Sequence, residues 1–98
     1  MDAFNKLMEA SLEELAIWGA SHPDDKAFCE ALQPKLALLA SMTSMLDRCK
    51  QAHVLRRIIA DQGPLSGEFM PSFWSLSEGL SRWQKQQGLS NTDLWSLE

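Results

Sequence analysis

The side chains of this sequence with the greatest capacity for chemistry are its two cysteines and two histidines. Cys49 and His53 are four residues apart, a spacing that places both on one face of a helix and that occurs in zinc sites. His22 and Cys29 would complete a set of four ligands. However, no CxxC pair is present, and His22 and Cys29 lack a typical ligand spacing. We therefore predict that the protein holds no metal and no cofactor.

Neither cysteine has the surroundings of a catalytic nucleophile. Such a thiol needs a histidine to activate it and a third group to orient that histidine, whereas apolar helix faces favour inert thiols. Adjacent carboxylates occur at Glu13-Glu14 and Asp24-Asp25, but neighbouring residues on a helix diverge, so both pairs indicate solvated charge or helix caps. The phosphate-binding pattern GxxxxGK[ST] is absent. The sequence therefore predicts a protein that is not an enzyme.

One local excess of positive charge departs from the net charge of −4. Its members are Arg48, Lys50, His53, Arg56 and Arg57. This basic run could contact phosphates, and residues 24–62 could form a helix-turn-helix. No expected helix gathers the Arg, Lys, Asn and Gln side chains that read bases on one face, which argues against nucleic acid as the partner. We expect the run to face an acidic surface, either the chain's own Glu9 and Glu13 or a partner's, and keep a nucleic-acid-binding transcriptional regulator as the alternative.

Composition bounds the remaining possibilities. A chain of 98 residues with 45% hydrophobic and 22% charged residues is typical of one globular domain, here residues 1–98. Two cysteines are too few for a disulfide scaffold and indicate a reducing, cytoplasmic setting. The acidic, amphipathic N-terminus does not resemble a signal peptide. The longest apolar run, residues 36–40, is far shorter than the roughly 20 residues that span a membrane, so we expect no membrane segment.

The element that must position these side chains is the stretch over residues 33–62. It contains no Gly, and no Pro after Pro34, until Gly63-Pro64 ends it, which predicts one long central helix over about residues 34–62. Seven of its side chains fall on one side with the spacing of a coiled-coil seam. They are Leu38, Leu39, Met42, Met45, Leu46, Cys49 and Ala52. Beyond His53 the apolar positions move to nearly the opposite side. The helix therefore either bends near residues 50–54 or is straight and covered on more than one side.

Shorter helices complete the predicted fold. We expect one over residues 2–20, capped by Asp2 and terminated with the help of Gly19. A short one over residues 25–32 follows, and Gln33-Pro34 either separates it from the central helix or only kinks the chain into that helix. A further helix begins at Pro71, tolerates Gly79 if a neighbour lies close there, and is terminated by Gly88. A final short turn follows within residues 90–97. The sequence thus predicts an all-α protein, a small bundle of four to five helices around one long central helix.

The strongest functional signal is an excess of large apolar side chains. Four Trp and five Met occur in 98 residues, and both types are enriched at interfaces. Ile17 and Trp74 also point away from the apolar faces of their helices. We predict a non-enzymatic protein–protein interaction module, such as a small regulatory adaptor, antiactivator or chaperone, that forms a homodimer through residues 38–52 or uses this seam for a heterologous partner. The predicted partner-binding residues are Leu38, Met42, Met45, Cys49, Arg56 and Trp74.

Overall fold

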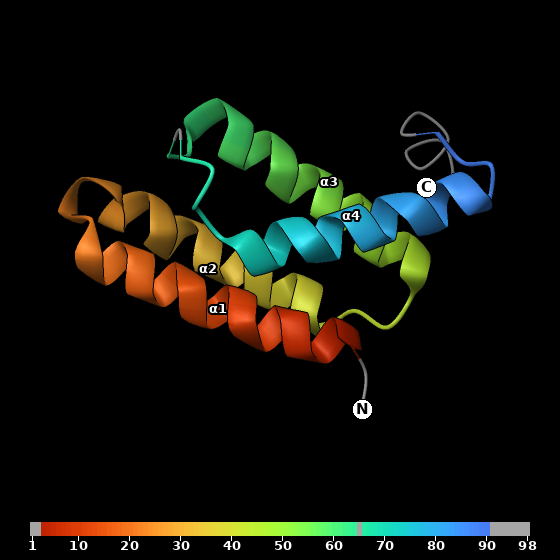
Figure 1. Ribbon diagram of the computed structural model, residues 1–98, viewed down its shortest axis with the longest axis horizontal. Helices are drawn as coiled ribbons and strands as arrows, with labels where there is room; N and C mark the ends of the chain where they lie inside the picture. The colour runs from red at the N-terminus through yellow and green to blue at the C-terminus, as the bar shows by residue number, and fades with distance from the viewer. Residues whose placement is uncertain (1–2, 65, 91–98) are drawn as a thin grey trace.

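The computed structural model of the protein describes residues 3–64 and 66–90. These residues form four α-helices and one short 3-10 helix: α1 (Ala3–Ser21), η1 (Pro23–Asp25), α2 (Lys26–Ser41), α3 (Met45–Gln62) and α4 (Pro71–Gln86) (Figure 1). No strand occurs among the described residues, which confirms the predicted all-α bundle. The expected cap at Asp2 and nearly all of the turn expected over residues 90–97 lie outside the described residues.

The four helices form a ring in which each one contacts two others. α1 lies against α2 and α4, and α3 lies against the same two helices. Each helix runs in the direction opposite to that of the helix before it (Figure 1). This is the topology of an up-and-down four-helix bundle, in which short connections join antiparallel neighbours. None of the described helices is long and apolar enough to cross a membrane.

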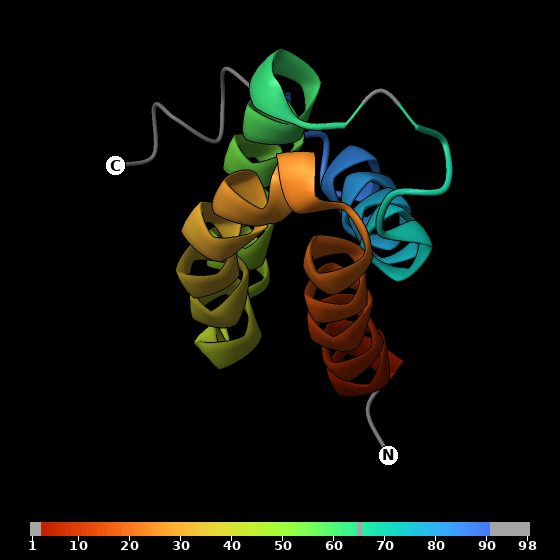
Figure 2. The ribbon, with the colours of Figure 1, turned by 90° about the vertical axis from the view of Figure 1, so that its left-hand side faces the viewer.

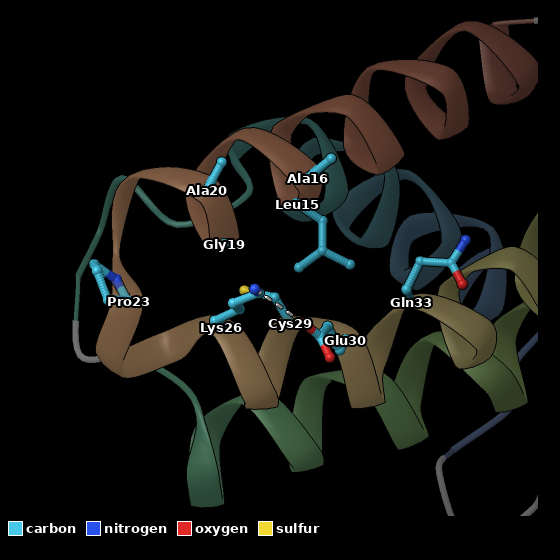
Figure 3. Close-up of a pocket in the computed structure, with 9 residues that line it drawn as sticks. All are labelled: Leu15, Ala16, Gly19, Ala20, Pro23, Lys26, Cys29, Glu30 and Gln33. Atoms are coloured by element: carbon cyan, nitrogen blue, oxygen red, sulfur yellow. Dashed lines mark ion pairs between the residues drawn. The ribbon is translucent and has the colours of Figure 1, made fainter.

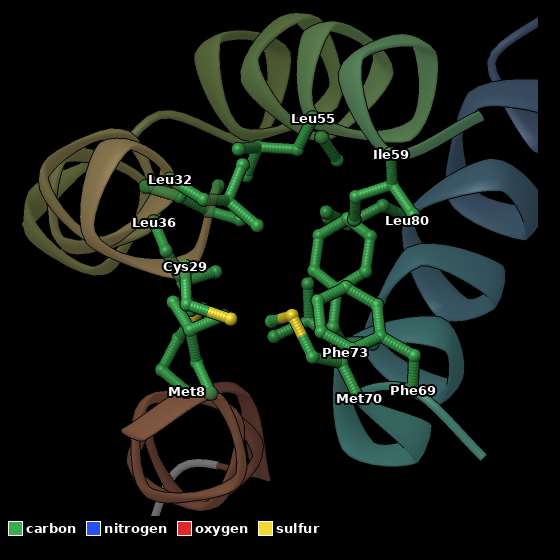
Figure 4. Close-up of a cluster of buried hydrophobic side chains, with 14 of the residues drawn as sticks. Met8, Cys29, Leu32, Leu36, Leu55, Ile59, Phe69, Met70, Phe73 and Leu80 are labelled. Atoms are coloured by element: carbon green, nitrogen blue, oxygen red, sulfur yellow. The ribbon is translucent and has the colours of Figure 1, made fainter. Parts of the chain in front are cut away.

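The core fills the space that the ring encloses (Figure 4). Each helix contributes buried side chains spaced three, four or seven residues apart, as expected for one apolar face. The loop before α4 adds Phe69 and Met70. The buried helical residues are Met8, Leu15, Cys29, Leu32, Leu36, Leu39, Cys49, Ala52, Leu55, Ile59, Phe73, Leu76 and Leu80.

The predicted central helix over residues 34–62 is wrong, because the chain breaks between α2 and α3. Met42 leaves helical geometry with φ −77° and ψ 140°, and Ser44 then caps α3 by accepting a 3.3 Å hydrogen bond from the backbone N–H of Asp47. Serine is among the preferred residues at this position. The change of face near His53 therefore reflects two separate helices: in α3 one stripe, from Cys49 to Ile59, faces the core throughout.

α2 also begins earlier than the sequence predicts. The helix expected over residues 25–32 and the first part of the expected central helix are one element, which passes through Pro34. A proline inside a helix removes one backbone hydrogen bond, here the one to the carbonyl of Glu30. Pro34 and Glu30 are both exposed, so water can satisfy that carbonyl. The proline therefore does not separate two helices.

The boundaries of α4 match the prediction. It begins at Pro71, and Gly88 follows its end with φ 69°, in the left-handed region that favours glycine. Its N-terminus receives a carboxylate from another helix: the backbone N–H of Ser72 donates to Glu14 Oε1 at 3.0 Å, and the Ser72 hydroxyl donates to Glu14 Oε2. A negative charge at this end of a helix is stabilising. Glu14 therefore fixes the start of α4 on α1.

Candidate interaction surface

A groove of about 610 Å³ lies between α1 and the start of α2 (Figure 3). Its floor contains the buried residues Leu15, Gly19 and Cys29. The exposed side chains of Ala16 and Ala20 form the wall on α1. The opposite wall consists of Pro23, Lys26, Glu30 and Gln33. The groove is therefore mainly apolar, with polar groups along one edge.

Small side chains on α1 explain the groove. At Gly19 the two helices approach so closely that an added Cβ would lie 3.2 Å from Cys29 Cβ. Gly19 thus serves helix contact, and the expectation that it terminates α1 is wrong, since the helix continues to Ser21. Ala16 and Ala20 carry only a methyl group, so they leave the space beside this contact unfilled. The groove therefore results from the positions of these three small residues on α1.

One end of the groove is fixed by contacts around Trp18. Its indole Nε1–H donates to Asp25 Oδ2 at 2.8 Å, and its ring stacks on His22 with the ring centres 3.8 Å apart. The Trp18 ring also meets Phe69 edge-on at 5.2 Å. These contacts hold the η1 turn against the end of α1. The wall at Pro23 is therefore positioned by the fold itself.

The predicted seam does not form one continuous surface. The side chain of Leu38 on α2 is 51% exposed, whereas that of Cys49 on α3 is only 1% exposed and its thiol contacts the carbonyl of Leu80 at 3.5 Å. Met42 and Met45 lie half-buried on either side of the α2–α3 break. Cys49 is thus a core residue in this fold, and Leu38 is the seam residue whose side chain reaches solvent most fully.

The other two predicted partner-binding residues lie on α3 and α4 and do not line the groove. Arg56 donates a 2.6 Å hydrogen bond to the Ser77 hydroxyl. Trp74, 37% exposed, is one turn before Ser77 on α4, and its Nε1–H donates to the carbonyl of Phe69 at 3.0 Å. Burial lowers the pKa of Arg56 from its usual value, and burial, together with Arg56 and the neighbouring Arg57, lowers that of His53.

The basic run makes contacts within the fold, as Arg48 and Arg56 illustrate. Arg48 Nε donates to the carbonyl of Met42 at 3.0 Å, and its guanidinium lies 3.7 Å from the centre of the Phe4 ring. Such a cation–π contact favours a fixed guanidinium. Arg56 donates to Ser77, as described above. These contacts connect the run to α1, α2 and α4, and neither is the predicted contact with Glu9 or Glu13.

The fold does not bring together the four candidate zinc ligands, His22, Cys29, Cys49 and His53. Cys29 lies against Gly19 at the floor of the groove, whereas Cys49 faces α4. Burial raises the pKa of both thiols; Asp25 adds to the rise at Cys29, and Arg56 opposes it at Cys49. Within residues 3–64 and 66–90, no three His, Cys, Asp or Glu side chains gather where they could hold a metal ion.

Sequence reasoning missed the groove. The available signal was three small residues on one side of α1, at positions 16, 19 and 20, a pattern that permits close helix approach but does not reveal an open space. No protein-family model, curated protein or solved structure matches this chain. The function of the surface is therefore inferred from its geometry.

Proposed function

We propose that this protein is a non-enzymatic protein–protein interaction module, acting as a regulatory adaptor, antiactivator or chaperone, that receives an apolar helix of a partner in the groove between α1 and α2. The observation that carries the proposal is the groove itself, about 610 Å³ in volume and mainly apolar in its lining. Concave apolar surfaces of this kind are typical binding sites.

The dimensions of the groove suit a helical ligand. Its wall on α2 extends from Lys26 to Gln33, about 10 Å at 1.5 Å per residue. A partner helix could therefore place about two turns along it, with apolar anchors at positions i, i+3, i+4 and i+7. The alanine wall of α1 would permit close backbone approach. Lys26 and Glu30, 3.9 Å apart in an exposed ion pair, would form the polar rim that surrounds most interface cores.

The chemistry of the groove supports binding rather than reaction. The Cys29 thiol lines its floor, and burial raises the pKa of that thiol. A thiol held protonated is a poor nucleophile. Two free, buried cysteines also suit the reducing conditions of the cytoplasm, where we propose that the protein acts.

A groove variant and a control variant elsewhere on the surface test the groove. In Ala16→Arg/Ala20→Arg, two long side chains would fill the groove from exposed positions of α1, where arginine is compatible with a helix. Ala60→Arg places the same side chain at an exposed position of α3 and serves as the control. Each tagged protein is used for capture from nuclease-treated host lysate, with quantitative mass spectrometry of the bound proteins.

The proposal predicts a stoichiometric protein partner that the wild type and Ala60→Arg retain and the groove variant loses by about tenfold or more, which corresponds to about 1.4 kcal/mol. Circular dichroism establishes that all three proteins remain equally helical. Equal capture by the groove variant and the control would rule out the groove as the docking site.

Self-association is the other mode of partner binding that we propose. Leu38, with its largely exposed side chain, would be the contact shared by two copies, next to the half-buried Met42 and Met45. Light scattering of the wild type and of Leu38→Glu tests this mode. A dimer that Leu38→Glu converts to a monomer would support it, and a wild type that is monomeric at all concentrations would contradict it.

A further inference from the structure

A second, smaller pocket of about 200 Å³ lies between α2 and α3, which are neighbours in the bundle (Figure 2). Four of the residues that line it have apolar side chains and two have polar ones. They are Phe28, Ala31, Leu32 and Ile58, followed by Lys35 and Gln62. None of these residues lines the groove between α1 and α2. The pocket is therefore a separate feature, with a mainly apolar lining and one positively charged side chain.

The core holds the apolar part of this pocket in place. Leu32 is 1% exposed and belongs to the core itself. Phe28 and Ile58 are half-buried and pack against that core, and the ring centres of Phe28 and Phe69 lie 6.2 Å apart. Ala31 is exposed and carries only a methyl group, so it leaves the space beside these side chains open. The fold thus forms the pocket without a ligand.

The two polar side chains reach the pocket from opposite ends. α2 and α3 are antiparallel, and Gln51, in the first half of α3, donates to the carbonyl of Lys35 at 3.0 Å. Gln62 is the last residue of α3. Because helical side chains lean toward the N-terminus of their own helix, Lys35 and Gln62 lean toward each other along the pocket. Within the described part of the chain, no carboxylate forms an ion pair with the Lys35 ammonium.

These features define a ligand by its size and its charge. An engineered apolar cavity of about 150 Å³ holds a benzene molecule, so this slightly larger pocket suits one ring or a chain of about six carbons. Apolar walls offer water few hydrogen-bond partners, which favours an apolar occupant. The ammonium of Lys35 favours a negative charge at the opening, and the amide of Gln62 can donate to the same group.

We propose that the pocket between α2 and α3 binds a small carboxylic acid as its anion. The apolar body of the acid lies against Phe28, Leu32 and Ile58, and its carboxylate lies between Lys35 and Gln62. Because such a ligand contacts both helices, its binding stabilises the bundle. This inference concerns α2 and α3 and does not depend on the groove between α1 and α2.

An amide NMR titration of the isotopically labelled full chain tests the proposal. The probes are two carboxylates, phenylpropionate and hexanoate, and the two corresponding alcohols. The amides of Ala31, Lys35 and Ile58 should shift saturably with at least one carboxylate, with a dissociation constant of about 5 mM or lower. That carboxylate should bind about two- to fivefold more tightly than its alcohol, a margin typical of a solvent-exposed ion pair. The two carboxylates distinguish a ring from a chain as the apolar body.

Two variants, each with a control, locate the binding. Ala31→Trp should abolish the shifts because its indole fills the pocket, and Ala60→Trp, at an exposed position of α3, should preserve them. Lys35→Met keeps the aliphatic stem but removes the charge, so it should reduce the affinity for the carboxylate to that for the alcohol. Lys6→Met, at an exposed position of α1, should leave both affinities unchanged. Circular dichroism establishes that the variants remain equally helical.

Four results would overturn the proposal. The first is that neither carboxylate gives saturable shifts at the pocket. The second is that the alcohol binds as tightly as its carboxylate, which would exclude a role for the charge. The third is that folded Ala31→Trp binds the carboxylate like the wild type. The fourth is that Lys35→Met and Lys6→Met bind the carboxylate equally well, and this result decides the matter even if Ala31→Trp does not fold.

Discussion

Replacing either of two helical glycines by alanine should change the stability of the protein, but in opposite directions. Gly79 lies inside α4, and a Cβ added there would have no atom within 4 Å. The methyl group therefore meets no obstacle, and the expected close neighbour at Gly79 is absent from the described residues. Gly19 lies inside α1, where a Cβ would approach Cys29 Cβ at 3.2 Å and Cys29 Sγ at 3.6 Å.

The magnitudes follow from these surroundings. Replacing a helical glycine by alanine is worth about 0.8–1 kcal/mol through the backbone alone, so Gly79→Ala should stabilise the protein by nearly that amount. In a domain of this size this raises the thermal midpoint by about 4–8 °C. Gly19→Ala gains the same backbone contribution, but it forces α2 away from α1, and overpacking of this kind costs about 1–3 kcal/mol. We expect a net loss of roughly 1 kcal/mol.

The assay is reversible denaturation by urea and by heat, followed by circular dichroism at 222 nm. Both variants carry the same chemical change in a helix, so the difference between them reports the space around each Cβ. A neutral or destabilised Gly79→Ala, or a Gly19→Ala protein as stable as Gly79→Ala, would refute the reasoning.

Three further predictions concern the fold. Leu36→Ala, at a fully buried site, should cost about 2–5 kcal/mol in urea denaturation, whereas Leu38→Ala, two residues away and 51% exposed, should change stability by less than about 0.5 kcal/mol; similar losses would contradict the described burial. Glu14→Gln should destabilise the protein by about 1 kcal/mol, because it weakens the carboxylate contact at the start of α4, and the exposed neighbour Glu13→Gln should not. Because burial raises the pKa of both thiols, iodoacetamide at pH 8 should alkylate Cys29 and Cys49 much more slowly in the native protein than in urea, and equal rates would show that the thiols are accessible.

The class of fold was accessible from the sequence because its signals are local. Apolar residues recur with helical spacing, and Pro71 and Gly88 mark the two ends of α4 through fixed φ and positive φ respectively. The predicted first helix over residues 2–20 likewise differs from α1 by one residue at each end.

The break at residues 42–44 contains neither Gly nor Pro, so the absence of these residues does not establish a continuous helix. The stronger local signal was Ser44 followed three residues later by Asp47, a polar pair that begins a helix. Pro34, by contrast, suggests a helix boundary where α2 is continuous. Its exposed position allows water to replace the hydrogen bond that proline removes. At both positions the course of the helix depends on which groups can satisfy the backbone hydrogen bonds, and the residue type alone does not determine it.

The groove depends on tertiary structure and could not be predicted. Alanine is common in helices, so Ala16 and Ala20 carry no signal of a groove in the sequence. They border an open space because Gly19, on the same side of α1, allows α1 to lie close to Cys29 of α2. Likewise, Cys49 and Leu38 share the predicted stripe, yet the break between α2 and α3 sends one into the core and leaves the other at the surface.

The most direct test of the proposed interaction is site-specific photocrosslinking in the native host. A benzophenone amino acid is introduced at Ala20, on the wall of the groove, and separately at Ala60, on the exposed side of α3. Our account predicts that illumination produces a discrete adduct with one partner protein from position 20 and not from position 60. The same adducts from both positions, or no adduct from position 20 in cells where position 60 captures a partner, would contradict it.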